Sequence, residues 1–127
     1  MYRRAKESLQ QQLKEHGYFN YRNSNGFLET NTSVELSLLI MFDLLSPEDQ
    51  SALIGQLTSQ LETKNNQSQQ YGDWGIMTAF PFYHNVHLQV EKSMAPYRYH
   101  NGGDWPYWDG VYAMAKLMKE TEAGAIH

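Results

Sequence analysis

The chain has 127 residues, 41% of them hydrophobic, no cysteine and a formal net charge of −4 at pH 7. This length corresponds to a single domain, and the lack of cysteine excludes disulfides and thiolate metal sites. The acidic balance argues against a nucleic-acid-binding surface, and no apolar run approaches the roughly 18 residues that a membrane span requires. We therefore expect a soluble, cytoplasmic domain or a piece of a larger protein.

Hydrophobic spacing predicts a first helix over residues 2–16. Tyr2, Ala5, Leu9 and Leu13 recur every three or four positions among polar residues, and Gly17 follows as a helix-ending residue. The pattern is typical of a surface helix with one apolar stripe.

Two further helices are expected over residues 32–45 and 47–63. Thr32 and Glu35 have the spacing of a capping box, and the following VELSLLIMFDLL is apolar on nearly every side. Ser46, Pro47 and the acids after them mark the start of the third helix. A buried helix followed closely by an amphipathic one predicts an antiparallel helical hairpin.

Residues 64–104 are expected to form a long loop rich in aromatic side chains, before a last helix over 105–119. A loop of this length in a compact domain is usually functional. Residues 71–105 show no clean period of 2 or 3.6, so we expect an ordered loop with short extended pieces there, and an all-α fold of antiparallel helical hairpins overall.

The stretch YHNGGDWPYW, residues 99–108, carries the clearest chemical signal. Two glycines permit close approach of a ligand, His100 and Asn101 supply hydrogen-bonding groups, and Trp105 and Trp108 offer flat apolar faces. Sugars present both polar edges and C–H faces, so this mixture suits a carbohydrate. Packing of a helix-entry turn would explain the same residues.

A second loop of the same character, which contains Tyr71 and Trp74, suggests that the two loops share a cleft. Hydrolysis of a glycoside needs a pair of carboxyl groups at a fixed separation. The carboxyl groups that could supply such a pair are those of Glu29, Asp73, Asp104 and Asp109. Asp104 directly precedes a helix, a position more typical of a helix cap than of a catalytic acid.

We expect no metal site and no cofactor. His84 and His87 have a spacing that a metal could use on a helix, but no third ligand stands in a clear relationship to them. The sequence also contains no phosphate-binding glycine loop and no nucleophile elbow.

The motif YHNGG, one variable residue, then Trp105-Pro106 resembles a motif of neutral invertases and of glycogen-debranching amylo-α-1,6-glucosidases. The resemblance extends over most of residues 27–118. It implies part of a six-hairpin (α/α)6 toroid, and sugar contacts from Tyr99, His100, Asn101, Gly102 and Trp105. In those families the general acid precedes the matching region and the second carboxylate follows it.

Together these observations predict a glycoside hydrolase-like chain that acts on or binds an α-glucoside or oligosaccharide. The expected substrate-binding residues are Tyr71, Trp74, Tyr99, His100, Asn101, Gly102, Gly103, Trp105 and Trp108, and the expected catalytic carboxyls are Glu29 and Asp104. The alternatives are a non-catalytic carbohydrate-binding or self-assembling module and a purely structural helical protein. Because the apolar helix 32–45 would lack neighbours in a partial toroid, we also expect a homo-oligomer or a complementing chain.

Overall fold

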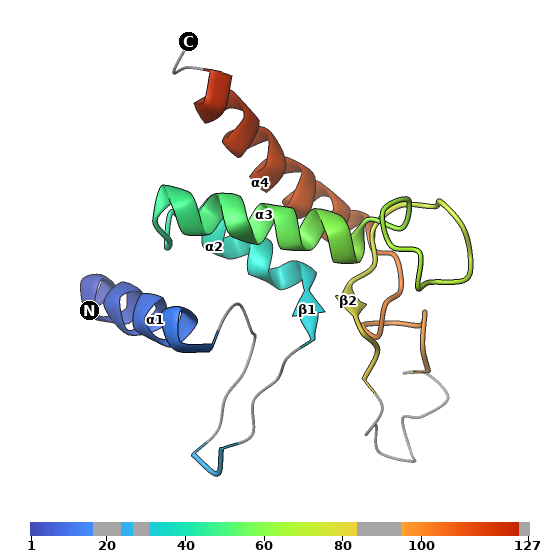
Figure 1. Cartoon of the computed structure of the whole chain (residues 1–127), viewed down its shortest axis with the longest axis horizontal. Helices are drawn as coiled ribbons and strands as arrows, with labels where there is room; N and C mark the ends of the chain where they lie inside the picture. The colour runs from blue at the N-terminus through green and yellow to red at the C-terminus, as the bar shows by residue number, and fades with distance from the viewer. Residues whose placement is uncertain (17–23, 27–30, 84–94, 125–127) are drawn as a thin grey trace.

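The computed structural model describes residues 1–16, 24–26, 31–83 and 95–124 (Figure 1). Their element order is α1 (Tyr2–His16), β1 (Thr32–Ser33), a 3-10 turn η1 (Val34–Leu36), α2 (Ser37–Met41), α3 (Pro47–Leu61), β2 (Ala79–Phe80) and α4 (Pro106–Gly124). None of the helices among these residues is long and apolar enough to cross a membrane.

The expected all-α fold is wrong, because the described chain also contains a small antiparallel sheet. Strand β1 pairs with β2, with Thr32 opposite Phe80 and Ser33 opposite Ala79. The described residues thus form four α-helices and a two-stranded sheet that packs against α3, a mixed arrangement that gives no support to part of an all-helical toroid.

The predicted helix 32–45 is the origin of this difference. Its first two residues form β1, the next three form η1, and only the five residues Ser37–Met41 are α-helical. The hydroxyl of Thr32 accepts a hydrogen bond from Gln56 Nε2 at 2.7 Å, and also bonds to the side chain of Gln60. Contacts with α3 and β2 therefore occupy Thr32, and the expected capping box does not form.

Helix α3 begins where local signals place it. Ser46 accepts a hydrogen bond from the backbone N–H of Asp49 at 3.2 Å, and Pro47 occupies the first turn. Leu53, Leu57 and Leu61 on one side of the helix are fully buried. They meet Val34, Leu36 and Ile40 beneath α3, and Tyr112 and Ala115 of α4 complete the core.

The apolar stretch 34–45 is covered by the chain itself. Val34, Leu36, Ile40 and Leu45 are all buried, and α2 packs against both α3 and α4. Phe42, at the turn after α2, is 61% exposed. The sequence predicted an oligomer because an apolar helix 32–45 would lack neighbours. Among the described residues this stretch is covered, so that reason does not hold.

Helix α1 attaches to the turn after α2 by polar side chains. Tyr2 Oη, Lys6 Nζ and Gln10 Nε2, at successive intervals of four, donate to three consecutive backbone carbonyls, those of residues 42–44. Because residues four apart lie on one face of a helix, this spacing sets the rotation of α1 about its axis.

Residues 95–103 form a compact loop that folds back against β2 and the residues beside it through hydrogen bonds. The Asn101 side chain is fully buried, accepts from the backbone N–H of Tyr83 at 2.7 Å and donates to its carbonyl at 3.1 Å. The N–H of Gly102 donates to Thr78 Oγ1 at 3.1 Å, and the carbonyl of Gly103 accepts from the N–H of Thr78 at 3.2 Å. The glycine pair thus permits two segments of backbone to approach closely.

We predict that Gly102→Ala destabilises the fold by about 2–4 kcal/mol, because a Cβ at this position would lie 2.3 Å from the Phe82 ring and the backbone has φ +91°. Urea unfolding measures the loss. The matched control is Gly55→Ala within α3, where a Cβ meets nothing within 4 Å and where alanine should stabilise by about 0.5–1 kcal/mol. Equal effects of the two substitutions would contradict the packing described for Gly102.

Candidate functional site

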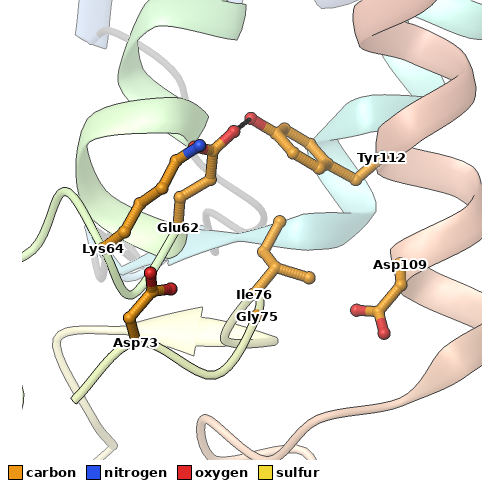
Figure 2. A pocket seen from close by; sticks show the side chains of 7 residues that line it. All are labelled: Glu62, Lys64, Asp73, Gly75, Ile76, Asp109 and Tyr112. Carbon is orange, nitrogen blue, oxygen red and sulfur yellow. Dashed lines mark hydrogen bonds and ion pairs between the residues drawn. The ribbon is translucent and has the colours of Figure 1, made fainter.

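An open pocket of about 380 Å³ lies where the end of α3, the segment after it and α4 meet (Figure 2). It is lined by Glu62, Lys64, Asp73, Gly75, Ile76, Asp109 and Tyr112. The antiparallel bridge between Glu62 and Ile76 holds two of its walls together. Most of its side chains are ionisable, so the pocket offers proton-transfer and hydrogen-bonding groups around a small apolar patch.

Glu62 is buried and binds several donors. One carboxylate oxygen accepts from Tyr112 Oη and from Lys116 Nζ, each at 2.6 Å, and the other accepts from Asn65 Nδ2 at 2.8 Å. Lys64 adds an ion pair at 3.5 Å. Burial raises the pKa of Glu62, but hydrogen bonds from Lys116 and Tyr112, with the nearby positive charges, lower it by more, so the net shift is downward. Glu62 is therefore a carboxylate at neutral pH.

Tyr112 extends this hydrogen-bond network to α3. Its hydroxyl donates to Glu62 and lies 2.8 Å from Thr58 Oγ1. Burial, and then the hydrogen bond to the Glu62 carboxylate, raise the pKa of Tyr112, so the phenol keeps its proton. The network joins α3 and α4 through a fully bonded charge, which is the condition for a buried ion to be tolerated.

Asp109 is the acid of the pocket. Burial, and then a hydrogen bond and the negative charge of Asp104, raise the pKa of Asp109 to about 6. Its Oδ1 is buried and has no hydrogen-bond partner among the described residues. A carboxyl group in this setting keeps its proton to a higher pH than an ordinary aspartate and is half protonated near pH 6, as one member of a pair of neighbouring carboxyl groups often is.

Asp104 and Asp109 are too close to act together as a glycosidase pair. They are in hydrogen-bond contact, whereas the two carboxyls of such enzymes stand about 5–5.5 Å or 6.5–9.5 Å apart. Asp73 lies across the pocket from Asp109, with Ile76 between them in the view of Figure 2. The second expected catalytic residue, Glu29, lies outside the described residues, as do His84 and His87.

An aromatic surface lies beside the pocket. The rings of His100 and Trp105 stack with centroids 5.3 Å apart and planes at 12°, and Tyr99 meets both rings edge-on. The Tyr99 side chain is 52% exposed, and its carbonyl accepts from Trp105 Nε1 at 3.0 Å. Asp104 Oδ2 is 3.6 Å from the position of a Cβ at Gly75, so Asp104 connects this surface to the pocket wall.

The other expected sugar-contacting residues are divided between surface and interior. Tyr71 is exposed and meets the Tyr97 ring edge-on at 4.6 Å. Trp74 and Trp108 are half-buried and pack against the core. Asn101, Gly102 and Gly103 are buried in the loop 95–103, where their polar groups form hydrogen bonds with other residues of the chain.

Sequence reasoning named Asp73 and Asp109 among the possible carboxyl groups, but it missed Glu62, Tyr112 and Lys116, whose hydrogen bonds organise the pocket. Glu62 directly follows the apolar face of α3, and Asp109, Tyr112 and Lys116 recur at helical spacing on α4. That spacing predicts a shared face. It could not indicate that the face meets Glu62. Among the described residues no group of three or more His, Asp or Glu side chains is arranged to hold a metal ion.

We predict that Glu62→Gln lowers the free energy of unfolding at pH 7 by about 2–4 kcal/mol, because Lys116 loses its buried counter-charge. Since the pKa of Glu62 is lowered in the fold, its contribution is full above the ordinary pKa of 4.5 and disappears as pH falls through the folded value. Urea unfolding at pH 7 and pH 3 should therefore show a difference between the proteins that narrows in acid. Glu7→Gln in the exposed Arg3–Glu7 pair is the control, with an expected change below about 0.5 kcal/mol. A difference that stays constant across pH would refute this assignment.

Comparison with known proteins leaves the site to be judged on its own geometry: no protein-family model, no curated protein and no solved structure matches the chain.

Proposed function

We propose that this chain binds a carbohydrate across the aromatic surface and the pocket, and that it hydrolyses a glycosidic bond there. The observation that carries the proposal is the continuity of two features. A group of contacting rings, formed by exposed Tyr99 and His100 and half-buried Trp105, adjoins through Asp104 a pocket with carboxyl groups on opposite sides. Aromatic rings suit the C–H faces of a sugar, and carboxyl groups suit its hydroxyls. The resemblance of residues 99–106 to debranching enzymes makes α-glucosides the first substrates to test.

In the proposed reaction Asp109 is the general acid and Asp73 is the general base. Asp109 gives its proton to the glycosidic oxygen as the bond from that oxygen to the anomeric carbon breaks. Asp73 removes a proton from a water molecule whose oxygen bonds to the anomeric carbon, and solvent restores both carboxyl groups. One water is consumed for each bond cleaved. Attack by water from the side opposite the leaving group inverts the anomeric centre.

Asp104 has a supporting role in this proposal. Its negative charge and hydrogen bond help keep the proton on Asp109, after burial. This differs from the role of catalytic acid that the sequence suggested for Asp104. A non-catalytic carbohydrate-binding module is the second candidate, favoured by the internal bonds that occupy the Glu62 carboxylate. Self-association and a cytoplasmic location stay predictions.

We predict that Tyr99→Ala weakens oligosaccharide binding about three- to tenfold, because one exposed stacking face is lost. Fluorescence of the three tryptophans during titration with maltooligosaccharides measures the dissociation constant. Phe42→Ala is the matched control, since Phe42 is similarly exposed but lies at the turn after α2. Binding that is unchanged in Tyr99→Ala, or equally weakened in both variants, counts against the aromatic surface as the sugar contact.

We predict that Asp109→Asn reduces hydrolysis of the best α-glucoside by about 10²- to 10⁴-fold while sugar binding persists. In the unmodified chain the rate should fall as pH rises above about 6, where Asp109 loses its proton. Monosaccharide release measured from pH 4 to 9 gives both results. The control is Glu48→Gln, an exposed acid on the first turn of α3, which should leave the rate unchanged.

Two outcomes separate the candidates. Sugar binding without any turnover would establish the binding module and remove the catalytic step. Turnover that Asp109→Asn retains would assign the acid to another residue.

A further inference from the structure

Two asparagines of the chain, Asn25 and Asn101, are followed directly by glycine. Such an asparagine is chemically reactive, because glycine has no Cβ to keep its backbone nitrogen away from the side-chain amide. The nitrogen attacks Cγ of the asparagine, ammonia leaves, and a five-membered succinimide ring forms. Water then opens the ring to aspartate or isoaspartate, so one water is consumed and one ammonia is released for each asparagine converted.

The first of these pairs is open to solvent. Asn25 and Gly26 are both exposed at a turn. Gly26 has φ +84°, and nothing lies within 4 Å of the position of a Cβ there. Water therefore reaches both reacting groups, and no neighbouring atom at Gly26 obstructs the closure of the ring.

The second pair is held by the fold at both reacting groups. The Asn101 side chain is fully buried, and its amide bonds to the N–H and the carbonyl of Tyr83 at 2.7 Å and 3.1 Å. The nitrogen that would attack, that of Gly102, donates its proton to Thr78 Oγ1 at 3.1 Å. Closure of the ring requires the Asn101 amide to leave Tyr83 and the Gly102 nitrogen to leave Thr78. The loop 95–103 must therefore open before Asn101 can react.

We propose that Asn25 is a site of spontaneous deamidation in the folded chain, and that the loop 95–103 protects Asn101 from the same reaction. The rate at Asn101 is then the unhindered rate multiplied by the fraction of molecules whose loop is open. The reaction also prevents the loop from closing again, because the amide that donates to the Tyr83 carbonyl becomes a carboxylate, which cannot donate. A reversible opening thus becomes a permanent one. The proposal stands independently of the sugar chemistry, since no step of it needs a ligand.

Both rates can be measured in one sample of the purified chain. After incubation in mildly alkaline buffer, peptide mapping by mass spectrometry locates each conversion, and an isoaspartate methyltransferase assay confirms the product. In the folded chain Asn101 should react at least about 100-fold more slowly than Asn25, because several buried hydrogen bonds must break first. In concentrated urea the two rates should agree within about threefold, since neither asparagine is then protected.

Three substitutions test the origin of the difference. Thr78→Val removes the acceptor of the Gly102 N–H and should speed the reaction of Asn101 about tenfold or more, while Asn25 of the same molecule serves as the control. Trp105→Phe loses the bond to the Tyr99 carbonyl and is a milder variant of the same loop, for use if Thr78→Val does not fold. Gly26→Ala should slow the reaction of Asn25 about tenfold in buffer and in urea alike, because the added Cβ obstructs the attack.

Each result supports or overturns one part of the proposal. Equal rates at Asn25 and Asn101 in the folded chain would overturn the protection. An Asn25 that reacts in urea but not in buffer would overturn its assignment as the open site. A rate at Asn101 that stays unchanged in both Thr78→Val and Trp105→Phe would overturn the loop 95–103 as the source of the protection.

Discussion

The buried carboxylate of Glu62 sets the relation between the two longest core helices. A charge in a protein interior is tolerated only when it is paired and its oxygens accept hydrogen bonds. Tyr112 and Lys116 meet this need from α4, and Asn65 meets it from the turn after α3. Because Tyr112 and Lys116 are four residues apart, bonding both to one oxygen fixes the rotation of α4 about its axis. Asp109, one turn before Tyr112, is thereby directed into the pocket (Figure 2).

Two acids of the pocket, Glu62 and Asp109, have opposite environments. Glu62 is surrounded by donors and stays ionised, whereas Asp109 has a buried oxygen without a partner and a second carboxyl beside it. Pairs of carboxyl groups whose pKa values are driven apart are common where protons are transferred. Asp73, across the pocket from Asp109, is exposed, so a carboxyl group of raised pKa lies opposite an exposed carboxyl group.

The sequence predicted what depends on local signals and missed what depends on distant contacts. Ser46 and Pro47 predict the start of α3, and the glycine-rich motif marks residues 99–108 as an unusual segment. Both signals depend only on residues that are neighbours in the sequence. Strand β1 consists of Thr32 and Ser33, two residues that the local pattern predicts as the start of a helix. The strand exists because Ala79 and Phe80, far along the chain, lie alongside it. Glu62 could not be identified for the same reason, because its hydrogen-bond partners Tyr112 and Lys116 lie on α4, far along the sequence.

The YHNGG segment shows how one motif serves two purposes. Asn101, Gly102 and Gly103 are buried in hydrogen bonds and close backbone contacts, while Tyr99 and His100 of the same turn are exposed. Tyr99 has φ +47°, a conformation that costs a non-glycine residue about 1 kcal/mol or more. Hydrogen bonds of the buried residues 101–103 offset that cost, as does the hydrogen bond from Trp105 to the Tyr99 carbonyl. Together these bonds hold the backbone of the exposed residues Tyr99 and His100. The backbone that carries Tyr99 and His100 is therefore held by the fold itself, so the proposed carbohydrate binding would cost little further backbone entropy from the protein.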